Sequence, residues 1–330
     1  MLRLHAYEYH RPETVDEAIA LLVEHAGDVM PIAGGTDLVP NMKHRLFTPG
    51  HLVSLRGIVE MRGIAEDEAG FTIGAATSLD QVARDARVVE VLPSLAMACS
   101  LVSCPQLRRM GTIGGNVCLD TRCTYYNQTL FWRKALGYCL KKDGTACHVV
   151  KGGTRCVAAH SADTATALLP LEAELRIVGP EGERVTPIAS FFTSDGVWNR
   201  RMNPGELLIS IHVPRPATGA RHSFQKLRAR DSIDFPMLNL AARVDFDAEG
   251  VITGLQMVAS AMGRYPRKLG KLDAMAVGKA LAEPVMEELA EQAFRQCHPL
   301  DNIPVDTEWR RAMVPVLVRR ALSEIADADR

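Results

Sequence analysis

Four cysteines in one segment have the residue type and spacing that could hold a metal centre. They are Cys123, Cys139, Cys147 and Cys156, separated by 15, 7 and 8 residues. Iron–sulfur clusters use four thiolates because soft sulfur ligands suit iron and balance its charge. Structural zinc sites usually have two close C-x2–4-C pairs, and these spacings fit neither that pattern nor the compact runs of ferredoxins. The segment therefore predicts a metal centre, with an iron–sulfur cluster favoured and zinc as the alternative.

The remaining cysteines have simpler interpretations. Free cysteines are among the most buried residues, so we interpret Cys99, Cys104 and Cys297 as core or surface thiols. Cys118 is the one rival ligand, because it lies five residues before Cys123.

Polar and aromatic side chains fill much of the same segment. His148 is expected to be solvated, with a role as a hydrogen-bond donor behind the metal ligands as the alternative. Tyr125, Tyr126, Phe131 and Trp132 form an aromatic cluster, which is expected to be local core under a loop or a shield that keeps water from iron. Because the segment is otherwise polar and glycine-rich, we expect bound metal to supply its folding energy.

Two glycine pairs, Gly34-Gly35 and Gly114-Gly115, could bind a phosphate. Backbone N–H groups in such turns can approach an anion closely because no Cβ is in the way. Thr36 and Thr112 add hydroxyl groups, and Asn116 adds an amide. A glycine pair is also often no more than a turn. The chain has no G-x-G-x-x-G after a strand, so the sequence lacks the NAD-type fingerprint.

Two charged residues further along the chain can be interpreted from their local pattern. Asp163 precedes the apolar run Ala167-Leu168-Leu169, so we expect it to cap a helix over 164–169. Lys226 lies in an expected strand, where a lysine is by default a solvated charge.

Turn residues and apolar periodicity predict the elements that would position these side chains. Thr14-Val15-Asp16-Glu17 is a capping-box pattern for a helix that Gly27 ends, and a strand at 30–33 leads into the first glycine turn. The other expected strands lie at 52–55, around 64, and at 71–73, 173–178, 207–213, 224–230, 238–246 and 252–262; the other expected helices lie at 38–46, 78–88, 93–103, 274–282, 285–296 and 307–326.

A chain of 330 residues should contain two or three domains. We expect an N-terminal α/β unit at 1–56 and a second unit at 57–218, with the cysteine segment inserted at about 120–160. A C-terminal α+β domain should follow at 219–330, after the linker candidate Pro-Arg-Pro-Ala-Thr-Gly at 214–219.

The composition is that of an ordinary globular protein, with 47% hydrophobic and 23% charged residues. A net charge of −1 gives no electrostatic footprint for nucleic acid. No apolar run approaches the length that spans a bilayer, and the polar N-terminus does not match a signal peptide. We therefore expect a cytoplasmic protein without a membrane partner, whose eight cysteines stay reduced.

The runs Ala33-Gly34-Gly35-Thr36-Asp37-Leu38 and Thr112-Ile113-Gly114-Gly115-Asn116, followed by Asp163, resemble the FAD-binding subunit of the xanthine oxidase (molybdenum hydroxylase) family. The resemblance covers most of the chain and implies an α+β fold. This fold is a PCMH-type FAD-binding unit of two subdomains plus a C-terminal domain with a three-stranded antiparallel sheet and helices.

In that family the two glycine turns embrace the FAD pyrophosphate. The acid that matches Asp163 contacts the flavin nucleotide, the lysine that matches Lys226 lies near the isoalloxazine, and the backbone at Leu208 matches a flavin-edge position. Leu119 departs from the family's small polar residue, so no contact is assigned to it. The implied FAD-binding residues are Ile32, Ala33, Gly34, Gly35, Thr36, Asp37, Leu38, Thr112, Gly115, Asn116, Asp163, Leu208 and Lys226.

The inserted segment resembles one type of subunit within that family. Its runs Cys123-Thr124-Tyr125-Tyr126-Asn127-Gln128, Gly137-Tyr138-Cys139-Leu140-Lys141 and Cys147-His148-Val149 resemble the β subunits of 4-hydroxybenzoyl-CoA reductases. There, four cysteines hold a 4Fe–4S cluster, so the implied cofactors of this chain are FAD and one 4Fe–4S cluster. The implied partners are a molybdopterin-binding large subunit, a 2Fe–2S small subunit and ferredoxin or a similar electron donor, in a dimer of heterotrimers.

The resemblance implies a redox relay without a catalytic acid or base on this chain. Electrons would run from ferredoxin through the 4Fe–4S cluster, FAD and the 2Fe–2S clusters to molybdenum, where an aromatic CoA thioester loses its phenolic hydroxyl. One alternative is a hydroxylase or dehydrogenase that passes substrate electrons outward through the same centres. Another alternative is a non-redox scaffold whose cysteines hold zinc.

Overall fold

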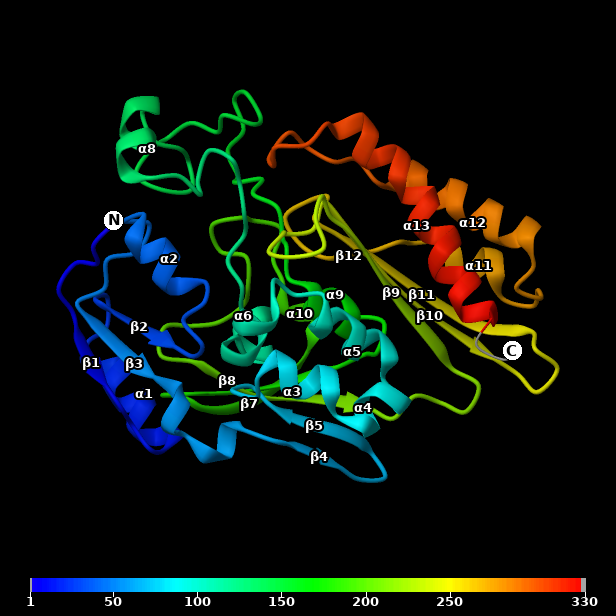
Figure 1. Cartoon of the computed structure of the whole chain (residues 1–330), viewed down its shortest axis with the longest axis horizontal. Helices are drawn as coiled ribbons and strands as arrows, with labels where there is room; N and C mark the ends of the chain where they lie inside the picture. Colours follow the sequence, from blue (N-terminus) through cyan, green and yellow to red (C-terminus); the bar gives the residue numbers. More distant parts are fainter. Residues whose placement is uncertain (1, 328–330) are drawn as a thin grey trace.

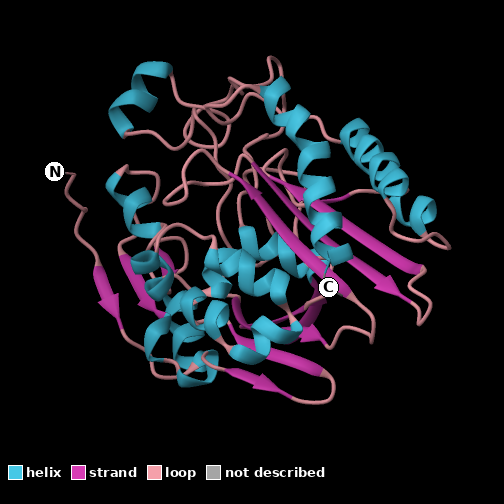
Figure 2. Ribbon diagram, turned by 45° about the vertical axis from the view of Figure 1, so that its right-hand side comes forward, coloured by secondary structure: helices cyan, strands magenta, loops and turns pink. Residues whose placement is uncertain are grey.

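A computed structural model describes residues 2–327 and contains three β-sheets with helices packed between and around them (Figure 1 and Figure 2). The first sheet is parallel, with the strand order β1-β3-β2. Thr14 begins the first helix by accepting a hydrogen bond from the N–H of Glu17, as the capping pattern predicts. The elements of this part are β1 (Glu8–His10), α1 (Val15–Glu24), β2 (Val29–Ile32), α2 (Leu38–Lys43) and β3 (His51–Ser54).

The second sheet is antiparallel, with the order β4-β5-β8-β6-β7. One helix expected at 78–88 is in fact two, because the Asp85 carboxylate accepts hydrogen bonds from the N–H groups of Arg87 and Val88 and begins a new helix. The strands are β4 (Ile64–Glu66), β5 (Gly70–Gly74), β6 (Glu174–Gly179), β7 (Gly182–Pro187) and β8 (Leu207–Pro214). The helices are α3 (Leu79–Arg84), α4 (Ala86–Val91), α5 (Pro93–Ser100), α6 (Pro105–Met110), α7 (Ile113–Val117), α9 (Asp163–Leu168) and α10 (Ile188–Phe191), with 3-10 turns at Leu55–Gly57 and Val59–Met61.

The C-terminal sheet contains the three expected antiparallel strands and one short additional strand, in the order β12-β11-β10-β9. Helices pack on it as expected, and α13 lies along β9 and β10 on the right of Figure 1. The elements are β9 (Arg221–Leu227), β10 (Leu238–Phe246), β11 (Ile252–Ser260), β12 (Arg267–Lys268), α11 (Leu272–Ala276), α12 (Glu283–Gln296) and α13 (Thr307–Asp327).

Strand β10 joins the two main hydrophobic cores because its side chains alternate between the faces of the sheet. Leu238 and Leu240 face the C-terminal core with α12 and α13, whereas Ala241 belongs to the core of the preceding sheets and helices. Helices α5 and α9 contact the face of the C-terminal sheet that carries Ala241. The C-terminal sheet is therefore buried on both sides, which also buries polar residues of β9 and β10 that face α9.

The cysteine segment leaves this framework between α7 and α9 and rises above α2 in Figure 1. It contains one regular element, α8 (Leu130–Leu136), which Thr129 caps and Gly137 ends in the left-handed conformation. Its apolar core is small and centres on Leu46, Tyr126 and Cys139. Among residues 2–327, no helix is long and apolar enough to cross a membrane.

Candidate functional site

The first glycine turn follows β2 and forms a set of unpaired backbone donors. A Cβ on Gly34 would overlap the carbonyl group of Met110, and Gly35 has a φ of +71°, so both positions require glycine. Within the described residues 2–327, the N–H groups of Gly34, Gly35, Thr36 and Asp37 have no hydrogen-bond acceptor. Four consecutive free donors at the carboxyl end of a strand form an anion-binding concavity.

The second glycine turn lies against the first but uses its donors differently. The Gly114 N–H donates to the carbonyl of Ala75, and the Gly115 N–H donates to the hydroxyl of Thr112 at 3.1 Å. The expectation that this pair offers free N–H groups is therefore wrong. Gly114 is required for packing instead, because a Cβ there would overlap Ala75. The Asn116 amide oxygen accepts from Thr164, which leaves the amide nitrogen as the donor of that side chain.

Asp163 and Lys226 form a buried ion pair. Lys226 Nζ lies 2.6 Å from one Asp163 oxygen, and Asn239 Nδ2 donates to the other at 2.7 Å. Lys226 and Asn239 are opposite each other on β9 and β10, so both side chains face α9. Asp163 does not cap α9, and Lys226 is 1% exposed, so both local expectations are wrong. Burial raises the pKa of Asp163, and the Lys226 ammonium opposes that shift.

The structure thus brings most of the implied FAD-binding residues to two neighbouring regions. Met110 and Gly111 place the second glycine turn directly beside Gly34. Leu208 is buried in β8 beside a bulge in the pairing with β6, away from either glycine pair in the sequence. Ile32 ends β2, Ala33 to Asp37 form the first turn, Leu38 begins α2, Thr112, Gly115 and Asn116 form the start of α7, and Asp163 and Lys226 form the buried pair.

All four segment cysteines line a single cavity. Cys139 and Cys156 are buried, and Cys123 and Cys147 are half-buried. Backbone N–H groups of Val150 and Ala158 point at the sulfurs of Cys147 and Cys156, each at 3.4 Å. Burial raises the pKa of Cys123 to about 11. The sequence therefore identified a set of thiols that the fold does bring together.

The other four cysteines of the chain lie outside this cavity. Cys118 Sγ lies 3.8 Å from the sulfur of Met202 and does not line the cavity. Cys99 and Cys297 are buried in the two main cores, as expected for core thiols. Cys104 is partly exposed at the start of α6.

The expected solvation of His148 is wrong. Its Nε2 lies 2.6 Å from the Tyr138 carbonyl oxygen, and its ring packs 5.2 Å from Tyr125 at the cavity wall. The aromatic cluster is divided, because Tyr126 is 2% exposed whereas Phe131 is 83% exposed. Local core is therefore the right interpretation for Tyr126 but not for Phe131.

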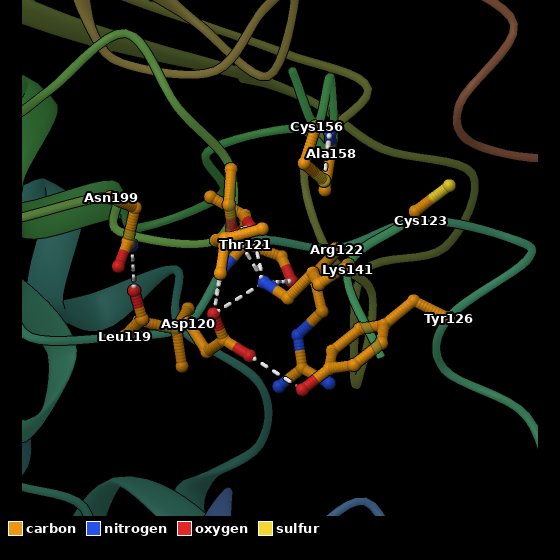
Figure 3. A network of polar contacts seen from close by, with 12 residues as sticks. Leu119, Asp120, Thr121, Arg122, Cys123, Tyr126, Lys141, Cys156, Ala158 and Asn199 are labelled. Carbon is orange, nitrogen blue, oxygen red and sulfur yellow. Dashed lines mark hydrogen bonds and ion pairs between the residues drawn. The ribbon is translucent and has the colours of Figure 1, made fainter. Parts of the chain in front are cut away.

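A network of polar contacts supports one side of the cavity (Figure 3). The ammonium of Lys141, 5% exposed, donates to the Asp120 carboxylate at 2.5 Å, to the Thr121 hydroxyl at 2.6 Å and to the Gly196 carbonyl at 2.8 Å. Tyr126 donates its hydroxyl proton to the same carboxylate at 2.9 Å. Sequence reasoning missed this network, because Lys141 belongs to a polar run that is typical of a solvated turn.

Arg122 connects the cysteine segment to the first glycine turn. Its guanidinium forms an ion pair with Asp37, and it lies 4.4 Å from the ring centroid of Phe235. Its backbone pairs with Ala159, so the two ends of the segment are hydrogen-bonded to each other. Burial lowers the pKa of Arg122 to about 10. The metal-ligand candidate Cys123 is therefore one residue from a side chain that contacts the anion-binding turn.

Asn302 of the C-terminal domain holds both ends of the segment. Its carbonyl accepts from the Thr124 N–H at 2.9 Å, and its side-chain amide donates to the Val157 carbonyl at 2.7 Å. Asn302 is fully buried. Local sequence gives no sign of this contact, whereas Asn239, a polar residue inside the apolar strand β10, carries a signal that could have been noticed.

Comparisons with known proteins agree with this arrangement. Residues 5–216 match the family described as the FAD binding domain in molybdopterin dehydrogenase, and residues 222–325 match the CO dehydrogenase flavoprotein C-terminal domain. The chain is 29% identical to the carbon monoxide dehydrogenase medium chain of Afipia carboxidovorans over 96% of each chain. It is 32% identical to the aldehyde oxidoreductase FAD-binding subunit PaoB of Escherichia coli, over 74% of this chain and 79% of that one.

A solved structure gives the same result for the whole fold. A chain of the reconstituted CO dehydrogenase from Oligotropha carboxidovorans superposes with a TM-score of 0.81 at 27% identity, covering 99% of this chain and 100% of that one. The expected α+β fold is therefore confirmed, with the FAD-binding PCMH-type domain followed by the domain with the antiparallel sheet. The chain belongs to the family of FAD-binding medium subunits of the molybdenum hydroxylases, which includes the xanthine dehydrogenases and the carbon monoxide dehydrogenases.

Proposed function

We propose that this chain is the FAD and 4Fe–4S electron-transfer subunit of a molybdenum enzyme of the 4-hydroxybenzoyl-CoA reductase type. One observation carries the proposal: the four segment cysteines line a single cavity, and the segment is joined to the anion-binding glycine turn by the Arg122–Asp37 ion pair. The specific substrate rests on the resemblance of the segment's sequence to the β subunits of those reductases.

The residues of the glycine turns and of the buried pair fit FAD. The free N–H groups of Gly34 to Asp37 would bind the pyrophosphate, and Thr112 and the Asn116 amide would add donors. Asp163, Lys226 and the backbone of Leu208 would contact the flavin nucleotide and ring. When bound, FAD supplies exchange between two-electron and one-electron transfer.

The donor set and its spacing fit an iron–sulfur cluster better than a single zinc ion. Tetrahedral zinc with Zn–S bonds of 2.3 Å places its sulfurs about 3.8 Å apart. In the described part of the chain, no three of the four sulfurs lie within 4.8 Å of one another. The sulfurs are therefore spaced too widely for one zinc ion, and the four thiolates would hold a 4Fe–4S cluster, which supplies one-electron transfer.

Protein groups around the cavity would tune such a cluster. N–H groups that point at cluster sulfurs and nearby cations stabilise the added negative charge of a reduced cluster. Ala158 and Val150 provide such N–H groups, and Lys141 provides a buried ammonium in the cavity wall. Gly196 permits close packing there, because a Cβ would lie 2.7 Å from the sulfur of Cys156.

The proposed complex contains a molybdopterin-binding large subunit, a 2Fe–2S small subunit and ferredoxin or a similar donor, as a cytoplasmic dimer of heterotrimers. Reductive dehydroxylation consumes two electrons and two protons, breaks the C–OH bond of the aromatic ring and releases water. The substrate would bind to the large subunit, so no residue of this chain is assigned an acid–base role.

Iron and acid-labile sulfide analysis after anoxic purification tests the cofactor proposal. We expect about four iron and four sulfide per chain, together with one FAD. Zinc without sulfide or flavin would instead support the zinc-stabilised scaffold. The Cys118→Ser variant is the matched control and should keep the same iron content, because Cys118 does not line the cavity.

The substrate and direction of electron flow need the assembled enzyme. We expect reduced ferredoxin and 4-hydroxybenzoyl-CoA to give benzoyl-CoA. The second candidate is oxidation of a substrate with electrons leaving through this subunit, and it is favoured by the names of the relatives, which are dehydrogenases and an aldehyde oxidoreductase. Substrate oxidation with an acceptor dye, and no dehydroxylation with reduced ferredoxin, would support that candidate.

A further inference from the structure

Three histidines from separate elements meet beside the N-terminal sheet. His10 ends β1, His51 begins β3 and His25 follows the last residue of α1. One ring nitrogen of each lies within 4.8 Å of the nitrogens that the other two contribute. None of the three belongs to the glycine turns, the buried ion pair or the cysteine cavity, so the proposed function leaves this cluster unexplained.

The three imidazoles are in direct contact with one another. The rings of His25 and His51 stack with their centroids 3.8 Å apart and their planes at 6°. The ring of His10 lies 5.2 Å from His25 and 5.3 Å from His51. The Nε2 atom of His10 is 3.1 Å from the Nδ1 atom of His51, so one of these nitrogens donates a hydrogen bond and the other accepts it.

Backbone hydrogen bonds fix where the three side chains begin. The N–H of His51 donates to the carbonyl of Asp28, and the N–H of Asp28 donates to the carbonyl of His25. The Asp28 carboxylate accepts from the Gly50 N–H at 2.7 Å, and the Gly50 carbonyl accepts from the Glu8 N–H at 2.8 Å. The backbone of the cluster is therefore preorganised before any ligand binds, which reduces the entropy that binding must remove.

A carboxylate, that of Glu8, lies next to one of the three histidines. Glu8 and His10 are two residues apart on β1, so their side chains leave the same face of the strand. Glu8 is the cross-strand partner of His51, and its Oε2 lies 3.7 Å from the Nδ1 of His51. The Glu8 side chain is 74% exposed and is free to move toward the rings.

We propose that His10, His25 and His51, with Glu8, bind a divalent transition-metal ion of the zinc class. Imidazole nitrogens with one carboxylate are ligands that suit Zn²⁺, Ni²⁺ and Cu²⁺ rather than Mg²⁺ or Ca²⁺. Zn–N bonds of 2.0–2.1 Å place tetrahedral nitrogens roughly 3.4 Å apart, and the three ring nitrogens already lie within 4.8 Å of one another. The stacked rings must rotate about their Cβ–Cγ bonds, because in-plane lone pairs of parallel rings do not converge on one point.

Cobalt titration of the anoxically purified full chain tests this site, because Co²⁺ replaces Zn²⁺ and is visible by its ligand-field absorption. We expect one equivalent of Co²⁺ to bind without thiolate charge-transfer bands and to be displaced by Zn²⁺. The His25→Gln and His51→Gln variants should bind roughly 100-fold more weakly, since even loss of a residue behind a metal ligand costs 10–100-fold. The control His212→Gln removes a histidine of β8 whose contact is Thr72, and it should bind like the natural chain.

Two further measurements separate loss of the site from loss of the fold. Zn²⁺ should raise the melting temperature of the natural chain but not of the two histidine variants, because a ligand of the native state stabilises it by mass action. The Glu8→Gln variant should fold normally at this exposed position and bind about tenfold more weakly. Iron content should be the same in all variants, because none of the substituted residues lines the cysteine cavity. The histidine site is therefore tested separately from the proposed cluster.

Three results would overturn the proposal. They are the absence of saturable Co²⁺ binding, binding of equal strength in the natural chain and in both histidine variants, and thiolate charge-transfer bands that place the metal on cysteines.

Discussion

The glycine turns and the cysteine segment lie next to each other, but apolar packing holds the turns in place and polar contacts hold the segment. The turns are packed into the large core of the first two sheets, and Gly34 and Gly114 are in contact with backbone or side-chain atoms at distances that exclude a Cβ. The cysteine segment has a core centred on three side chains and is held by polar contacts of Lys141 and Arg122. The first site is preorganised by packing, and the second depends on charges and on whatever its thiols bind.

This difference indicates where each site should fail. A site inside a large core opens only when much of the domain unfolds, whereas a segment with few apolar contacts can open locally at a much lower free energy. The four predictions that follow test this distinction in decreasing order of expected effect.

The largest effect is expected for Cys147→Ser. Removing one of four thiolates should abolish nearly all iron binding, and amide hydrogen exchange should become fast across about 120–160, because the proposed cluster would supply folding energy there. FAD content should not change. Iron at the full level in the purified variant, or FAD lost together with iron, would contradict the separation of the two sites.

The next effect is expected for Lys226→Met, which leaves the buried Asp163 carboxylate without its cation. Breaking a buried ion pair in this way costs about 3–5 kcal/mol, so urea unfolding should occur at a clearly lower midpoint. The control Lys268→Met lies in the same sheet at an exposed position and should have little effect. Equal stability of the two variants would show that the pair does not hold α9 against the C-terminal sheet.

A smaller effect is expected for Gly34→Ala. The added methyl group overlaps the Met110 carbonyl, so the two glycine turns must separate, at a cost of about 1–3 kcal/mol. FAD should bind more weakly, measured by flavin fluorescence during dilution, and iron content should stay constant. Gly263→Ala is the control because a Cβ there meets no atom within 4 Å. Unchanged FAD affinity would argue against the first turn as the pyrophosphate site.

The smallest effect is expected for a change of one pH unit. Burial lowers the pKa of His160 to about 3 from 6.5 and that of His222 to about 4. Both side chains are therefore neutral in the folded state, and their contribution to stability is complete above pH 6.5 and is lost as pH falls toward those lower values. As pH falls, protonation of each of these two histidines should lower the free energy of unfolding by about 1.4 kcal/mol per pH unit between pH 6.5 and its folded-state pKa.

The His160→Leu variant provides the measurement. Chemical unfolding between pH 4 and 7 should show a shallower pH dependence than in the natural chain, and His222→Leu should show the same change over its narrower window. Identical slopes in all three proteins would mean that neither histidine is neutral when folded.

Much of the fold could be predicted because local signals agree with the tertiary structure. The alternating apolar residues of β10 predicted a strand at Leu238–Phe246, as observed, and Thr14 as a helix-capping residue predicted the start of α1. In contrast, α8 was missed although Thr129 and Gly137 are ordinary start and stop signals, because the segment as a whole is polar. β1 and β12 were missed because strands of two or three residues carry too little periodicity.

The candidate site was predictable as a set of residue types but not as a set of contacts. The four cysteines and the glycines could be selected from spacing and resemblance. The pairing of Asp163 with Lys226, the burial of Lys141 and the ion pair between Arg122 and Asp37 join residues that are far apart in the sequence. Local patterns indicate solvated charges at such positions, because the partner that neutralises each charge is supplied only by the fold.

The position of Asn302 in the chain has a consequence for biosynthesis. Its two hydrogen bonds hold Thr124 and Val157 together, yet it is synthesised long after either of them. While the ribosome is still making the last domain, the ends of the cysteine segment lack this clamp. In the proposed holoprotein, metal would therefore meet the fully clamped thiol pocket only when the polypeptide is nearly complete, so that loading would follow synthesis of the C-terminal domain.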